Sequence, residues 1–166
     1  DFVALADENL HALYRFVKYA KKIDIKPVIG LKIVLTYELS ETSFFTYVKT
    51  KKGYQNLLKI ALLQSQNNLS YEQLVNHQEG LIIVTSGQDS LLTKHILNDD
   101  LKQARNFIIR IKHDLKDLYL GLCLDTFDLE MKVAPVLTQC AEDYQLKLLP
   151  LHQTSYINKN DSDAYQ

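Results

Sequence analysis

The chain has 166 residues, of which 46% are hydrophobic and 23% charged, and its formal net charge is −1. This length and composition suit one globular domain with its own core, and the near-zero charge argues against an autonomous DNA-binding module. No apolar run reaches the length of a transmembrane helix, and Cys123 and Cys140 lack the spacing of a metal site. We therefore expect a cytoplasmic domain with reduced thiols and no membrane contact.

The first third of the chain alternates between strand and helix patterns. The apolar run Phe2–Ala6 predicts a short buried strand, and Asn9 is a suitable N-cap for the amphipathic helix that follows. Val28–Leu35 and Phe44–Val48 are rich in β-branched and aromatic residues. We expect these two runs to pair as a hairpin across a polar turn, Thr36–Ser43.

Helices and buried strands continue to the end of the chain. A helix is expected from Gly53, Ser70 and Gln73 have the spacing of a capping box, and Leu81–Val84 has the continuous apolar pattern of a fully buried strand. The next two helices have acidic or amide residues as their expected N-caps: Asp89, and either Asn98 or Asp99. The last predicted elements are strands at Leu118–Leu122 and Leu146–Leu151, separated by a helix that kinks or begins late at Pro135.

Apart from the one hairpin, strands and helices alternate along the chain. This order indicates an α/β fold with a mainly parallel sheet and helices outside it. No glycine-rich phosphate fingerprint follows any strand, so a nucleotide-binding Rossmann fold is disfavoured. Ser86 and Cys123 follow strands, as a nucleophile would. Ser86 lacks the Gly-x-Ser-x-Gly pattern, so we interpret it as a turn residue. No His is placed by sequence to activate Cys123, so we interpret it as a buried hydrophobe.

Several short motifs occur along the chain in order: Ala4–Leu10, Lys26–Lys32, Gly53–Leu57, Glu79–Gly87, Leu149–Tyr156 and Asp163-Ala164. Together they resemble the polymerase-and-histidinol-phosphatase (PHP) domain of bacterial DNA polymerase III alpha subunits. The resemblance covers nearly the whole chain and implies a distorted TIM-like (β/α)7 barrel. The family's opening His-x-His segment would precede Asp1, so we expect a barrel that is incomplete at its N-terminus. Residues 1–166 are thus interpreted as a single PHP-domain fragment of a larger polymerase chain.

Active members of this family hold a cluster of divalent metals with His, Asp and Glu side chains at strand ends. This chain departs from that pattern at most of the positions that can be matched. Asp7 keeps its residue type, but Glu8 replaces a His and Lys32 replaces a Glu. Leu124-Asp125 stands in place of Arg-His, and His152–Ser155 in place of Asn-Asp-x-His. The remaining donors cannot neutralise several divalent charges, and a lysine adds repulsion.

These departures predict a catalytically inactive domain with no catalytic, cofactor or metal site. The vestigial metal-ligand candidates are Asp7, Glu8, Asp125 and His152, which would form a site for one ion only if all four converge. For Asp7 and Glu8 we favour the ordinary role of acidic residues near the start of a helix.

The resemblance implies a structural part of a DNA-directed DNA polymerase, a nucleotidyltransferase of DNA replication, whose own Mg²⁺ site would lie elsewhere in the parent chain. The implied partners are the rest of the polymerase, DNA through the parent, and replisome subunits such as a proofreading exonuclease or a sliding clamp. One alternative is a metal-dependent phosphoesterase or 3′–5′ proofreading exonuclease with a reduced ligand set. Another is a free-standing phosphatase of the same fold.

Two groups of lysines stand out, one of Lys18, Lys21 and Lys22 and one of Lys49, Lys51 and Lys52. Both could reach DNA phosphates, but the near-neutral net charge favours solvated faces. The tyrosines show no spacing typical of a base-stacking platform.

Overall fold

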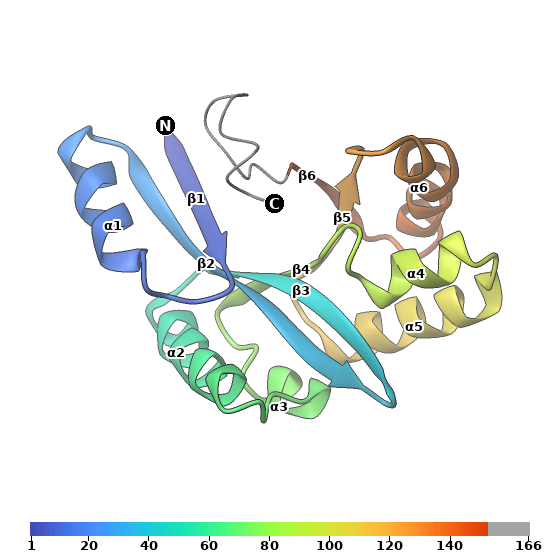
Figure 1. Ribbon diagram of the computed structural model, residues 1–166, viewed down its shortest axis with the longest axis horizontal. Coiled ribbons are helices and arrows are strands. Elements are labelled where there is room, and N and C mark those ends of the chain that lie inside the picture. Colours follow the sequence, from blue (N-terminus) through green and yellow to red (C-terminus); the bar gives the residue numbers. More distant parts are fainter. Residues whose placement is uncertain (153–166) are drawn as a thin grey trace, which may run out of the picture.

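A single curled sheet organises the computed structural model, which describes residues 1–152 (Figure 1). Within this range the strands lie in the sheet in the order of the sequence. The strands are β1 Phe2–Asp7, β2 Lys26–Tyr37, β3 Ser40–Val48, β4 Leu81–Thr85, β5 Leu118–Cys123 and β6 Lys147–Leu151. β1 is parallel to β2, β3 is antiparallel to both of its neighbours, and β4, β5 and β6 are parallel.

The helices lie on the convex side of the sheet, and the described part of the molecule has the shape of a half-barrel (Figure 1). They are α1 Leu13–Lys22, α2 Lys51–Ser65, α3 Tyr71–Asn76, α4 Leu91–Leu97, α5 Leu101–Asp114, the π-helical turn η1 Leu129–Val133, and α6 Ala134–Asp143. This confirms the predicted α/β architecture with helices outside. Among residues 1–152, no helix is long and apolar enough to cross a membrane.

The core lies between the sheet and the helices. Alternate residues of β2, namely Leu31, Ile33 and Leu35, are almost completely buried. Phe44 of β3 is also buried, and its ring stacks on that of Phe107 from α5 at 6.5 Å between centroids. Successive side chains of a strand point to opposite faces of the sheet. The residues between these buried ones therefore point to the concave face.

The hairpin between β2 and β3 is tighter than the predicted turn of residues 36–43. Both strands extend to Tyr37 and Ser40, and only Glu38, with φ +52°, and Leu39 separate them. The predicted turn was too long, and it extended into β3 because Thr42 and Ser43 are polar. Both are buried strand residues, and the Thr42 hydroxyl accepts a hydrogen bond from the Leu91 amide.

Three of the expected helix caps are wrong, each by a residue or more. Asn9 does not cap α1; its side-chain oxygen accepts from the His11 amide, and the helix begins only at Leu13. Ser90 rather than Asp89 caps α4. Asp100, rather than Asn98 or Asp99, caps α5. In such runs of polar residues, the position of the first helical turn is set by the packing of the following apolar residues.

The run Phe2–Ala6 forms the predicted strand β1, but the prediction that it is buried is wrong, since Phe2 is 75% exposed in this first strand of the sheet. Two other local predictions are confirmed. Ser70 and Gln73 form the predicted capping box. Pro135 lies in the first turn of α6, directly after η1, so the helix does begin late there. The end of the Leu149–Tyr156 motif and the Asp163-Ala164 pair lie outside the described residues.

Two glycines, Gly53 and Gly80, allow two motifs that are distant in the sequence to pack closely against each other. Gly80, with φ +76°, lies against the first turn of α2, and a Cβ added to Gly53 would lie 1.8 Å from the Gly80 carbonyl oxygen. That oxygen accepts hydrogen bonds from the amides of Lys49 and Thr50. The buried Asn56 side chain donates to the Glu79 carbonyl at 2.9 Å. This backbone contact fixes α2 against the start of β4.

Candidate functional site

The predicted site residues lie where the parallel strands end, at their C-terminal ends. We name this side of the sheet the strand edge. Asp7 ends β1 and pairs with Leu31, so the following residue, Glu8, comes beside Lys32 of β2. On the other side of β2 and β3, the segments after β4, β5 and β6 carry Asp89, Asp125 and His152 to the same edge. In α/β folds, active sites form where parallel strands end.

Lys32 forms the charged centre of the β1–β2 part of this edge. Its Nζ donates to Glu8 Oε1 at 3.2 Å and lies 2.9 Å from Asp89 Oδ2. The Lys32 side chain is only 15% exposed, whereas Glu8 and Asp89 are 66% and 53% exposed. Where the PHP resemblance implies a metal-binding glutamate, the structure therefore has a cation held between two carboxylates.

The surroundings of Lys32 keep it charged. Partial burial lowers the pKa of Lys32, but the hydrogen bonds and charges of Asp89 and Glu8 outweigh burial, and the net effect raises the pKa above its ordinary value. An ammonium group in this position excludes a divalent cation from the same two carboxylates, because like charges a few ångströms apart repel strongly in a partly desolvated site.

The main chain around Lys32 is fastened by Gln64 of α2. The Gln64 side-chain amide donates to the carbonyl oxygens of Glu8 and Lys32 and accepts from the Val34 amide. Gln64 thus satisfies the part of the β2 edge that extends past β1. No sequence signal marked Gln64, since a glutamine within a helix is common.

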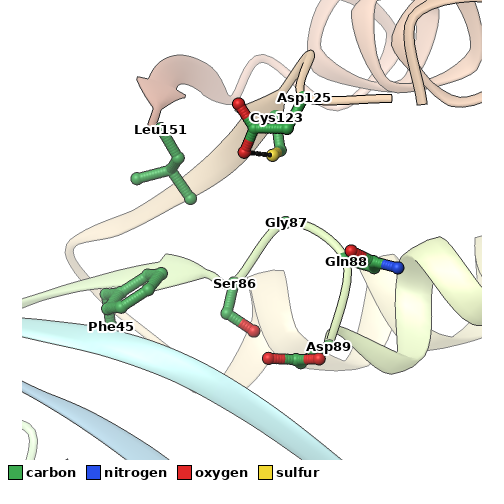
Figure 2. A pocket seen from close by; sticks show the side chains of 8 residues that line it. All are labelled: Phe45, Ser86, Gly87, Gln88, Asp89, Cys123, Asp125 and Leu151. Atoms are coloured by element: carbon green, nitrogen blue, oxygen red, sulfur yellow. Dashed lines mark hydrogen bonds between the residues drawn. The ribbon is translucent and has the colours of Figure 1, made fainter. Parts of the chain in front are cut away.

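A second cluster lies where β5 and β6 end. The Cys123 thiol donates to Asp125 Oδ2 at 2.8 Å, and His152 Nδ1 lies 3.0 Å from Asp125 Oδ1 (Figure 2 shows the thiol contact). Asp125 is partly buried at 33% exposure and His152 is largely exposed at 79%. The imidazole meets the carboxylate and not the thiol, so the three groups are not arranged as a nucleophile with its base.

The thiol itself is suppressed rather than activated. Burial raises the pKa of Cys123, and the neighbouring Asp125 carboxylate raises it further. A reactive cysteine requires the opposite shift. Cys123 is 8% exposed, which confirms its interpretation as a small buried residue.

The space between these clusters is small. Phe45, Ser86, Cys123 and Leu151 contribute to the walls of a cavity of about 20 Å³ (Figure 2), which has room for roughly one water molecule. Ser86 is buried, and its hydroxyl contacts both the hydroxyl and the carbonyl of Ser43. It therefore connects β4 to β3, in agreement with a structural role.

A larger hollow of about 230 Å³ lies beside Lys32. Its charged lining residues are Glu8, Glu41 and Asp89 against Lys32 and Lys94. The carboxylates outnumber the ammonium groups, so the hollow does not attract a phosphate dianion. Substrate pockets are usually larger, about 300–1,000 Å³.

The structure brings together only some of the vestigial metal-ligand candidates. Asp125 and His152 meet, Glu8 pairs with Lys32, and the Asp7 carboxylate accepts a hydrogen bond from the Glu8 amide. Within residues 1–152, no three His, Cys, Asp or Glu side chains are placed to hold one metal ion. This donor set does not fit the multinuclear metal cluster that the PHP resemblance implies.

Asp89 is the site residue that sequence reasoning missed. It was expected to cap α4, but Ser90 caps that helix and leaves Asp89 to pair with Lys32. A signal was present, because Asp89 follows the end of a buried strand, as the other candidates do.

Comparisons with known proteins give matches along nearly the whole chain. The family model for the PHP domain matches residues 1–123. A DNA polymerase III subunit alpha from Aquifex aeolicus is 26% identical over 98% of the chain, which covers 16% of that relative. The same subunit from Halalkalibacterium halodurans is 24% identical over 99% of the chain and 15% of its own length. That from Mycoplasma genitalium is 32% identical over 64% of the chain. The chain thus spans about one sixth of the curated relatives it matches.

Proposed function

Because the chain belongs to the PHP domain family, we propose that it is a structural, catalytically inactive PHP domain of a replicative DNA-directed DNA polymerase. Its fold would be the TIM-like (β/α)7 barrel of the family, and it would act in the cytoplasm. Its main partner would be the rest of the polymerase chain, where a separate Mg²⁺ site transfers nucleotides. A proofreading exonuclease or a sliding clamp would be a further partner, and DNA would be bound through the parent chain.

The observation that carries this proposal is the position of Lys32. Its ammonium group lies between Glu8 and Asp89, at the position where the PHP resemblance implies a metal-binding glutamate in active members. Metal-assisted hydrolysis needs an ion that lowers the pKa of bound water and stabilises phosphate charge. A lysine supplies one positive charge but no open coordination position. The hydrogen bonds of Asp125 to Cys123 and His152 use that carboxylate for packing instead.

The alternative is a phosphoesterase or 3′–5′ exonuclease with a reduced ligand set. The Asp125–His152 pair is the observation in its favour, since these are two ligand types that zinc and manganese accept. Two donors alone bind such ions weakly, and the approach of a third would require rearrangement of this edge.

Metal analysis of the full-length purified protein distinguishes the two proposals. We expect no stoichiometric zinc or manganese in the purified protein. Any 3′-end cleavage measured in Mn²⁺ should be the same in the wild type, Asp125→Ala and His152→Ala. His113→Ala, at an exposed position of α5, is the matched control. Bound zinc or manganese that is lost together with nuclease activity in the Asp125 and His152 variants would overturn the structural role.

A further inference from the structure

The solvent face of α1 has an unusual composition. Leu13, Phe16, Val17 and Ala20 form the buried or half-buried side of this helix, which packs against β1 and β2. All the exposed residues of α1 are basic or tyrosine: Tyr14, Arg15, Lys18, Tyr19, Lys21 and Lys22. The helix contains no acidic residue. A solvated surface helix usually mixes charges of both signs, as α5 does with Arg110 and Asp114.

The charge of the whole chain hides this concentration. Residues 13–26 contain five basic side chains and one acidic side chain, a net charge of +4. Because the total is −1, the other residues carry −5. Positive charge is thus gathered on one surface of a slightly acidic molecule, which is the electrostatic pattern of a polyanion-binding face.

The two tyrosines add a second property to this face. Tyr14 is 75% exposed and Tyr19 is 66% exposed. The Lys18 ammonium lies 6.0 Å from the centre of the Tyr14 ring, so cation and ring present one combined surface. Surfaces that bind single-stranded nucleic acid combine basic groups for the phosphates with aromatic rings on which bases stack.

We propose that the outer face of α1 is a contact surface for single-stranded nucleic acid, with Arg15, Lys18, Lys21 and Lys22 on phosphates and Tyr14 and Tyr19 against bases. An anionic membrane is the less suitable partner. A helix that lies in a bilayer interface inserts an apolar face, and the apolar face of α1 is already packed on the sheet. The inference stands on α1 alone and does not depend on whether the strand edge is inert.

The charge on α1 sets the expected salt dependence. If the four cations of this face each neutralise one phosphate, the slope of log K against log salt for a single strand is about −3. Affinity should then fall roughly 50-fold between about 50 and 200 mM salt. Lys18→Glu/Lys22→Glu removes two of these contacts from one side of the helix. It should weaken binding at least about tenfold at low salt and flatten the slope by about 1.4.

The test is fluorescence anisotropy with a labelled oligothymidylate of about 16 nucleotides and the full chain. The matched control is Lys51→Glu/Lys52→Glu, the same charge change at exposed positions of α2, and circular dichroism checks that both variants fold. We expect loss of binding only in the α1 variant. Tyr14→Ala/Tyr19→Ala should weaken oligothymidylate binding more than duplex binding.

Equal losses in the α1 and α2 variants would overturn the proposal, because they indicate a diffuse charge effect. Binding to phosphatidylserine vesicles without binding to oligothymidylate would overturn it in favour of a membrane. An unchanged single-strand preference in the tyrosine variant would refute the stacking part. In the full-length protein, a benzoylphenylalanine at position 19 should cross-link oligothymidylate, whereas one at exposed position 58 of α2 should not. The reverse pattern would contradict the proposal.

Discussion

Replacing Lys32 with glutamate tests whether this cation holds the strand edge together. Lys32→Glu removes two attractions, to Glu8 and Asp89, and introduces two carboxylate–carboxylate repulsions in their place. Lys32→Met is the matched control, because it removes the charge and keeps most of the side-chain stem. The difference between the two variants isolates the new repulsion.

The size of the effect follows from the exposure of the partners. Glu8 and Asp89 are more than half exposed, so each lost ion pair contributes only about 0.2–1 kcal/mol. Each new repulsion at roughly 4 Å costs about 1 kcal/mol in a water-like environment. We therefore expect Lys32→Met to lower the free energy of unfolding by about 1 kcal/mol and Lys32→Glu by about 2–3 kcal/mol. In a domain of this size the second value corresponds to a Tm lower by about 5–10 °C.

The assay is urea and thermal unfolding of the full chain in EDTA and then in Mn²⁺. Lys32→Glu places a third carboxylate beside Glu8 and Asp89. Carboxylate oxygens are hard donors, and three of them together favour binding of a divalent ion. Mn²⁺ should therefore raise the Tm of Lys32→Glu and leave the wild type and Lys32→Met unchanged. Equal stabilities of the glutamate and methionine variants, or the same response of all three proteins to Mn²⁺, would refute the electrostatic role of Lys32.

The difference in stability between the wild type and Lys32→Met should depend on pH in one direction only. The pKa of Lys32 is raised in the folded state, so the stability it contributes is fully present below its ordinary value of 10.5. That stability is lost as the pH rises through the higher, folded-state pKa. The wild type should exceed Lys32→Met in stability by a constant amount from neutral pH to about pH 10, and the difference should shrink only above that range. A difference that disappears near pH 7 would contradict this assignment.

Two further predictions concern buried polar contacts. Asn56→Ala leaves the Glu79 carbonyl without its side-chain donor and should lower the free energy of unfolding by about 1–2 kcal/mol, measured by urea unfolding; a loss near zero would show that solvent replaces the amide. Asp125→Asn should lower the raised pKa of Cys123 and speed its alkylation by iodoacetamide at pH 8. Cys140, which lies away from Asp125, is the internal control for peptide mass spectrometry, and an equal acceleration at both thiols would point to local unfolding instead.

Local sequence patterns predicted the elements of this fold well, because period and capping are properties of neighbouring residues. The Ser70–Gln73 capping box and the buried strand before Thr85 are of this kind. The hairpin turn was predicted too long because Thr42 and Ser43 are strand residues whose polar groups find partners in α4 and directly after β4. Such partners are far away in the sequence, so polar residues in a strand were mistaken for a turn.

The strand edge illustrates the same limit. Sequence reasoning placed Glu8, Asp125 and His152 at strand ends, and the structure does bring them to one edge. It could not show which groups pair. Lys32 forms an ion pair with Asp89, a residue 57 positions away, and Asp125 accepts a hydrogen bond from the Cys123 thiol, two residues before it. Pairing depends on the curl of the sheet and on which residue caps α4, neither of which is a local property.

The distribution of charge separates the strand edge from α1 as functional surfaces. Glu8, Asp89 and Asp125 outnumber Lys32 at the edge, so a nucleic acid is repelled there unless metal ions are present. The outer face of α1 attracts a polyanion without any ion. Lys32→Met should therefore leave oligothymidylate affinity within about twofold of the wild type. Lys32 is not one of the roughly four phosphate contacts proposed on α1, so the loss of its charge changes binding only modestly. Lys18→Glu/Lys22→Glu should weaken affinity while leaving thermal stability nearly unchanged, because both side chains are exposed. Loss of binding in Lys32→Met would place the nucleic acid at the strand edge and contradict the separation of the two surfaces.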